Sequence, residues 1–148
     1  MKGSFGNQDL LGGSVTDPPG YRQLTIGAFL NVAGYLGHSA GHLHRGLQYT
    51  PSAVFWSGLV VGILAIVAVV MSVRRDPMAP QFAIALGVFN VLAFAAVHFP
   101  PYWGPFSEPW RSGVDPFSWI TLGAALLGSF SLGFAGVHAF SRRPKTAV

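Results

Sequence analysis

Three histidines are the residues of this chain that are best suited to chemistry. His38 and His42 are four residues apart, a spacing at which two side chains on one face of a helix can share a metal ion. His98 closes a later apolar segment that we expect to run in the same direction, which places it at a height similar to that of His42. Neutral imidazole binds zinc, copper and haem iron. The pattern therefore predicts either a metal ion held by these histidines or a haem b between His42 and His98.

Two carboxylates extend the candidate set of metal ligands. Glu108 and Asp115 lie in the loop that follows His98 and can complete a site with the three histidines. The chain has no Cys, which excludes thiolate ligands, iron–sulfur clusters and disulfides. His44 points to a different face and His138 lies at the opposite end, so neither joins the set. The competing interpretation is structural, because histidines near the ends of membrane helices also hydrogen-bond to water, lipid phosphate or carbonyl groups.

Motifs of known enzyme chemistry are absent from the sequence. It contains no nucleophile elbow, no H-E-x-x-H, no Walker loop and no Gly-rich dinucleotide turn. His38 and Ser39 are adjacent, but neighbouring residues on a helix point about 100° apart, and no carboxylate is close in sequence to orient the histidine. We therefore do not expect an enzyme.

The elements that must position these residues are four apolar segments. Hydrophobic residues make up 51% of the chain and charged residues 9%, compared with about 25% charged residues in an average soluble domain. Each segment has close to the roughly 20 residues needed to cross a hydrocarbon core. The first is the weakest, because Asn31, His38 and His42 interrupt it. We predict an all-α integral membrane protein, a bundle of four transmembrane helices at about 24–44, 53–73, 79–99 and 117–140.

The distribution of Lys and Arg predicts the orientation of this bundle. Most of them fall on one side of a four-span arrangement, and loops rich in these residues stay in the cytoplasm. Both termini are then cytoplasmic, with residues 1–21 as a flexible tail, 22–140 as the transmembrane domain and 141–148 as a basic tail. The formal charge of +4 is scattered, which argues against binding of nucleic acid. The excess of Arg over Lys, with abundant Ala, Gly and Val, suggests a bacterial plasma (inner) membrane.

The outer loop between the third and fourth segments is rich in proline and aromatic residues. Five prolines within 100–116 are interleaved with Tyr102, Trp103, Phe106 and Trp110. Proline blocks regular structure, and Trp and Tyr rings favour the headgroup layer of a membrane. We expect a stiff cap on the outer leaflet, which acts either as an aromatic anchor or as a lid over the outer mouth of the bundle.

Small and polar residues should hold the helices together. On the first segment, Asn31, His38 and His42 share a sector that should face the interior, whereas Phe29 should face lipid. Asn31 and Asn90 should lie deeper in the membrane, either as an interhelical hydrogen bond or as part of a transport path. The residues predicted to pack helices against one another are Asn31, Gly37, Gly41, Gly58, Gly62, Asn90, Ser129 and Gly133.

Three hypotheses about function follow from these patterns. The leading one is a non-catalytic accessory or scaffolding subunit of a larger membrane complex, without a cofactor. Its partners would be the lipid bilayer and either other membrane subunits or further copies of this chain. The second is a haem- or metal-binding redox protein that uses the histidines near the outer face. The third is a small transporter or proton-conducting protein, suggested by the Asn residues of the first and third segments.

Overall fold

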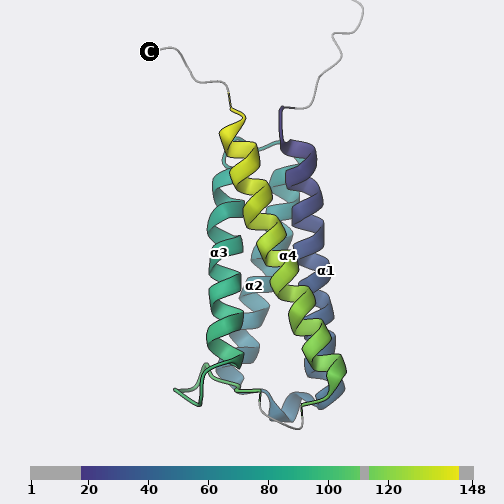
Figure 1. Ribbon diagram of the computed structural model, residues 1–148, viewed down its shortest axis with the longest axis vertical. Helices are drawn as coiled ribbons and strands as arrows, with labels where there is room; N and C mark the ends of the chain where they lie inside the picture. The colour runs from purple at the N-terminus through teal and green to yellow at the C-terminus, as the bar shows by residue number, and fades with distance from the viewer. Residues whose placement is uncertain (1–17, 111–113, 144–148) are drawn as a thin grey trace, which may run out of the picture.

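The described part of the protein is a bundle of four α-helices. The structure, a computed structural model, describes residues 18–110 and 114–143. Its elements are α1 (Tyr21–Arg45), the short 3-10 helix η1 (Leu47–Tyr49), α2 (Ser52–Val73), α3 (Ala79–His98) and α4 (Pro116–Ser141). The helices stand side by side, and the start of α1 lies at the same end as the end of α4 (Figure 1). The predicted all-α, four-helix fold is confirmed.

The helices begin and end close to the predicted limits of the apolar segments. The largest difference is at the start of α1, which begins at Tyr21 rather than at 24. α1 ends at Arg45 and is followed by Gly46, whose φ of 96° is favourable for glycine and strained for other residues. α4 begins after Asp115, whose carboxylate accepts hydrogen bonds from the N–H and the hydroxyl of Ser118. Most of the predicted tails, 1–21 and 141–148, lies outside the described residues.

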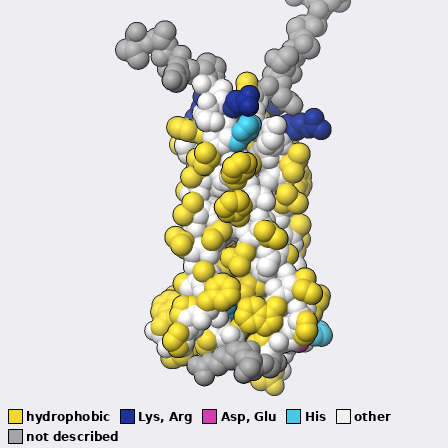
Figure 2. Space-filling model, viewed as in Figure 1, with side chains coloured by type: hydrophobic (Ala, Val, Ile, Leu, Met, Phe, Trp, Pro, Cys, Tyr) yellow, Lys and Arg dark blue, Asp and Glu magenta, His cyan; other side chains and the backbone are white. Residues whose placement is uncertain are grey.

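Three of the helices, α2, α3 and α4, are long and apolar enough to cross a membrane. Large hydrophobic side chains cover the outside of the bundle (Figure 2), among them Ile63, Leu92 and Phe134, each more than half exposed. Such a continuous apolar surface is suited to lipid rather than to water. The chain is therefore a multi-pass membrane protein. α1 has 25 residues, but its polar side chains lower its hydropathy relative to the other three helices.

α1 and α4 approach each other so closely that most side chains do not fit between them. A Cβ atom at Gly34 of α1 would lie 2.5 Å from the carbonyl oxygen of Ala124, and one at Gly128 of α4 would lie 2.5 Å from a carbonyl oxygen of α1. Gly27 and Gly41 also face α4 at short distance. These three glycines of α1, spaced by seven residues, form a stripe that lets the two backbones meet.

The predicted packing residues divide into two groups. Those that lie in contacts between helices are Asn31, Gly41, Gly62, Asn90, Ser129 and Gly133. Gly37 and Gly58, by contrast, have open space where a Cβ atom would be, so packing does not require glycine at either position. For α1 the reason is that its contact with α4 follows the seven-residue stripe through Gly34, and not a four-residue ridge from Gly37 to Gly41.

Two asparagines and a serine join three helices in the buried interior. Asn31 Oδ1 of α1 accepts a hydrogen bond from Ser129 Oγ of α4 at 3.0 Å and one from Asn90 Nδ2 of α3 at 3.5 Å. All three side chains are at most 2% exposed. An amide facing lipid would leave polar atoms without partners, so these bonds favour the observed rotation of each helix.

The two ends of the bundle differ in character. Arg22, Arg74, Arg75, Arg142 and Arg143 lie at the end where α1 starts, and their side chains gather there as a basic rim (Figure 2). We call this the terminal end, and we call the opposite end, which carries residues 99–115, the loop end. Arg45 is at the loop end. α4 packs against both α1 and α3. α2 lies on the opposite side of α1 and α3 from α4 (Figure 1).

Candidate metal site at the loop end of the bundle

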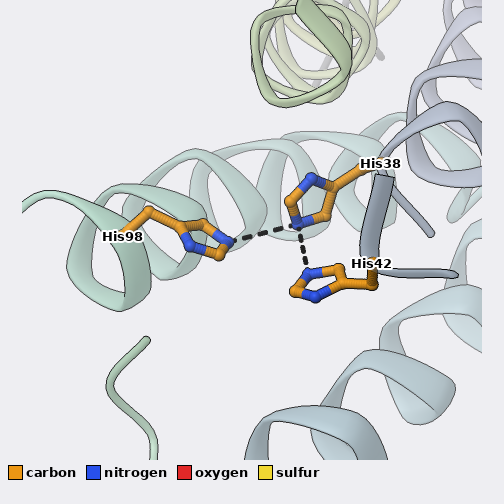
Figure 3. Close-up of side chains that lie close together, drawn as sticks. All are labelled: His38, His42 and His98. Carbon is orange, nitrogen blue, oxygen red and sulfur yellow. Dashed lines mark hydrogen bonds between the residues drawn. The ribbon is translucent and has the colours of Figure 1, made fainter. Parts of the chain in front are cut away.

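Three histidine side chains converge at the loop end. His38 and His42 come from the last turns of α1, and His98 is the last residue of α3 (Figure 3). His38 Nε2 lies 3.1 Å from His42 Nε2 and 3.2 Å from His98 Nε2. His38 and His98 are buried, and His42 is partly buried. Residues that are remote in sequence are thus brought to one point in the interior.

The separation of the three nitrogens is close to that of ligands on one metal ion. Two imidazole nitrogens bound to a tetrahedral zinc ion, each about 2.0–2.1 Å from it, lie about 3.3–3.4 Å apart. In the structure, one nitrogen of each histidine lies within 4.8 Å of the other two, and two of the separations are 3.1 and 3.2 Å. Within the described residues, this is the one group of at least three His and acidic side chains with such geometry.

Hydrogen bonds on the far side of two rings aim lone pairs at the centre of the group. His98 Nδ1 donates to the carbonyl oxygen of Glu108 at 3.1 Å, which leaves Nε2 unprotonated. His42 Nδ1 has two acceptors nearby, Thr50 Oγ1 at 3.0 Å and Glu108 Oε2 at 3.4 Å. Nη2 of Arg45, which also donates to Glu108, lies 3.3 Å away and can donate only to an unprotonated Nδ1. Thr50 and Glu108 thus favour a proton on His42 Nδ1 and a lone pair on Nε2, whereas Arg45 favours the other tautomer.

Neutral histidines do not satisfy this arrangement by themselves. His38 Nε2 faces the lone pairs of both His42 and His98, and a single N–H bond points at one of them. The other nitrogen then keeps its lone pair without a donor. If the proton is on His38 Nδ1 instead, all three lone pairs converge, and Nδ1 has no partner within the described residues. A cation at the centre removes the repulsion between these lone pairs.

The loop after α3 holds His98 in place by capping the end of its helix. The last carbonyl groups of a helix have no partner within it. Here Trp103 Nε1 donates to the carbonyl of Ala96 at 2.7 Å, and the N–H of Glu108 donates to that of Val97 at 2.9 Å. The N–H of Trp110 donates to the carbonyl of His98 at 2.9 Å. The proline- and aromatic-rich loop therefore closes α3 and fixes the backbone of one candidate ligand.

Trp110 covers the histidines on the side of the loop. Its ring is 7% exposed, and its centroid lies 4.4 Å from that of His98 and 5.7 Å from that of His38. The guanidinium of Arg45 lies over the same ring at 4.7 Å from the centroid. Trp103 and Phe106 of the same loop are about half exposed. The loop thus places some rings on the outside and one over the histidines.

A buried ion pair lies beside His42. Arg45 at the end of α1 bonds to the carboxylate of Glu108, which is 8% exposed. Burial raises the pKa of the Glu108 carboxyl, and the neighbouring Arg45 acts in the opposite direction. Arg45 was not among the residues singled out from the sequence. The signal was available, since a lone Arg at the end of a membrane helix needs a partner and Glu108 is one of two carboxylates in the loop.

The five predicted ligands do not all meet. His38, His42 and His98 form the cluster, and Glu108 contacts His42 from the outer side of its ring. Asp115 instead caps α4 through Ser118, whose hydrogen bonds lower the pKa of the Asp115 carboxyl. His44, excluded from the set, packs against Phe117.

A mostly apolar cavity of about 540 Å³ adjoins the three histidines. It lies between α2 and the pair α1 and α3, and its volume falls within the range of about 300–1,000 Å³ that is typical of small-molecule sites. All three histidines are among its lining residues, together with Phe55 and Gly58 of α2. The histidines are thus bounded by Trp110 on one side and by the cavity on another.

No protein-family model, no curated protein and no solved structure matches this chain. The functional proposal below is therefore based on the geometry of the site and on the membrane class of the fold.

Proposed function

We propose that this protein binds one transition-metal ion in the membrane through His38, His42 and His98. The observation that carries the proposal is the convergence of three Nε2 atoms, with 3.1 and 3.2 Å between neighbours. Imidazole ligands suit zinc and copper in particular, and the cluster contains no thiolate, since the chain has no Cys. The metal-binding hypothesis thus has direct geometric support, whereas the accessory-subunit hypothesis stays a prediction from composition.

A single ion fits the cluster better than a haem. A haem held by two histidines needs one ligand on each face of a flat ring. His38 Nε2 lies within hydrogen-bonding distance of both His42 and His98, and it occupies the space through which a porphyrin between these two would pass. We therefore favour a metal ion over the haem b that the sequence also allowed.

Three ligands leave a tetrahedral ion with one open position. Closed structural zinc sites use four protein ligands, whereas three protein ligands with an open position are typical of sites that also bind a small molecule. The backbone carbonyl of Glu108 accepts a hydrogen bond from the outer nitrogen of His98, and its carboxylate lies 3.4 Å from that of His42, as carbonyls and carboxylates do around metal-bound histidines. The arrangement is therefore suited to hold an ion and present it to a further ligand.

The site belongs to the outer face of a bacterial plasma membrane in this proposal. Four spans with both termini in the cytoplasm are supported by the basic rim at the terminal end, since Arg45 is the one Lys or Arg that the described residues have at the loop end. α1 is counted as a span because it packs along α4, which is itself long and apolar enough to cross. The histidines then lie just inside the outer leaflet.

Metal analysis of the purified protein tests the proposal. Protein extracted in mild detergent, incubated with Zn²⁺ or Cu²⁺ and freed of excess ion, should retain about one ion per chain by mass spectrometry. His38→Gln and His42→Gln should retain little. His44→Gln and His138→Gln are matched controls outside the cluster and should retain the full amount. A wild-type protein without bound ion, or equal losses in cluster and control variants, would contradict the proposal.

A further inference from the structure

The cavity beside the histidines has the form of a ligand site that is entered from the membrane. Its rim includes Leu43, Leu59 and Phe89, which are all exposed on the lipid-facing surface of the bundle. Its walls are mostly apolar, and the three histidines are the only side chains of its lining that are established metal ligands. A molecule that reaches the cluster by this route must dissolve in lipid and carry a polar group at one end.

We propose that the cavity binds a lipid-soluble phenol or hydroquinone, with the hydroxyl oxygen at the His38–His42–His98 cluster and the hydrocarbon body toward the lipid. The position of the head rests on the proposed metal function, because an oxygen donor there fills the open position of the ion. Trp110 covers another side of the cluster, so the cavity is the side from which this donor arrives.

The lining favours a neutral aromatic head over a charged one. Phe94 meets the ring of His38 edge-on, with centroids 5.0 Å apart at 82°, and Phe55, Trp103 and Phe106 also line the cavity. Planar rings pack well in such surroundings. A carboxylate head would have to lose its water of hydration in an apolar passage. A phenolic oxygen crosses without charge and still binds a metal ion.

The volume sets the size of the part that is enclosed. A cavity of about 540 Å³ holds a substituted aromatic ring and the start of a chain, but not a whole membrane lipid. The rest of the ligand's hydrocarbon chain would extend past the exposed rim and lie among the lipids. Headgroup identity, and not tail length, should therefore decide which molecules bind well.

Gly58 offers a way to fill the cavity without touching the histidines. It lines the cavity, and a Cβ atom there meets no atom within 4 Å, so a leucine fits the backbone and projects into the empty volume. Gly123 of α4 has the same open surroundings but is not part of the lining. Gly58→Leu and Gly123→Leu are thus a matched pair.

Binding of a decyl-substituted hydroquinone, kept reduced, tests the proposal on Zn²⁺-loaded protein in nanodiscs. Native mass spectrometry should show one bound probe for the wild type and for Gly123→Leu, and at least tenfold weaker binding for Gly58→Leu. Zn²⁺ content should be equal in all three. Decanoate and decane should bind at least tenfold more weakly than the hydroquinone. Equal binding by Gly58→Leu, or preference for decanoate, would overturn the proposal.

The same measurements separate this proposal from the metal function. His38→Gln should lose Zn²⁺ and, with it, most affinity for the hydroquinone. Full affinity without Zn²⁺ would overturn the placement of the head at the cluster. Protein that binds no Zn²⁺ but binds the probe in a manner sensitive to Gly58→Leu would contradict the metal function and leave the cavity as the ligand site.

Discussion

His38 is the residue on which the candidate site depends most. Its Nε2 is the only one of the three cluster nitrogens in the described structure that lies within hydrogen-bonding distance of both others. It is 5% exposed, so neither lipid nor bulk water relieves its conflict with the neighbouring lone pairs. A buried group with this unmet need is more easily explained by a bound cation than by helix packing.

Glu108 should act on the metal indirectly, as a positioning residue. Glu108→Gln removes the charge that faces His42 Nδ1 and leaves Arg45 without its partner, so we expect about 10- to 100-fold weaker binding of Zn²⁺. Competition with a chelating dye measures this affinity. Asp115→Asn changes the other carboxylate of the loop and should leave the affinity unchanged. Equal effects of the two substitutions would mean that Glu108 has no specific role at the cluster.

The sequence predicted part of this site and missed the rest for identifiable reasons. The i, i+4 spacing of His38 and His42, and the matching height of His98, follow from helix geometry alone. The contacts of Trp110 and Arg45 depend on how the loop folds back onto α3, and periodicity carries no information about that path. Asp115 lies in the same loop as Glu108, and only the observed cap on α4 separates their roles.

At the scale of the elements, the glycine stripe of α1 determines how its polar face is presented. Close contact with α4 along Gly27, Gly34 and Gly41 fixes the rotation of α1. Asn31 and His38 then lie in the interior, while Phe29 and Leu36 face outward, each more than half exposed. Hydropathy located the helices but not this stripe, because seven-residue and four-residue ridges both pass through Gly41 and only the partner helix distinguishes them.

Two equivalent substitutions on α1 should have different effects on stability. Gly34→Ala places a Cβ atom against the carbonyl of Ala124, so we expect a loss of about 1–3 kcal/mol from overpacking. Gly37→Ala, less than one turn further along, meets open space and should be neutral or slightly stabilising. Unfolding in detergent, followed by circular dichroism, measures both. Equal destabilisation would show that α1 does not pack on α4 through this stripe.

At the scale of the whole molecule, the absence of Cys makes the proposed topology easy to test. Gln48→Cys lies at the loop end and Ser141→Cys at the terminal end, and both positions are exposed. In intact cells, a membrane-impermeant maleimide should modify Gln48→Cys, whereas Ser141→Cys should react only after the membrane is opened. Modification of both in intact cells, or of Ser141→Cys alone, would contradict cytoplasmic termini.

In the metal-bound state that we propose, the loop that closes α3 links binding of the ion to the order of the segment that covers the site. The segment that bonds to the last carbonyls of α3 also accepts a hydrogen bond from His98 Nδ1 and carries Trp110. The coupling is reciprocal. If the ordered segment strengthens binding of the ion by aligning His98, the bound ion stabilises the ordered segment by the same free energy. In that proposed state, displacement of this segment from α3 would weaken the binding of the ion.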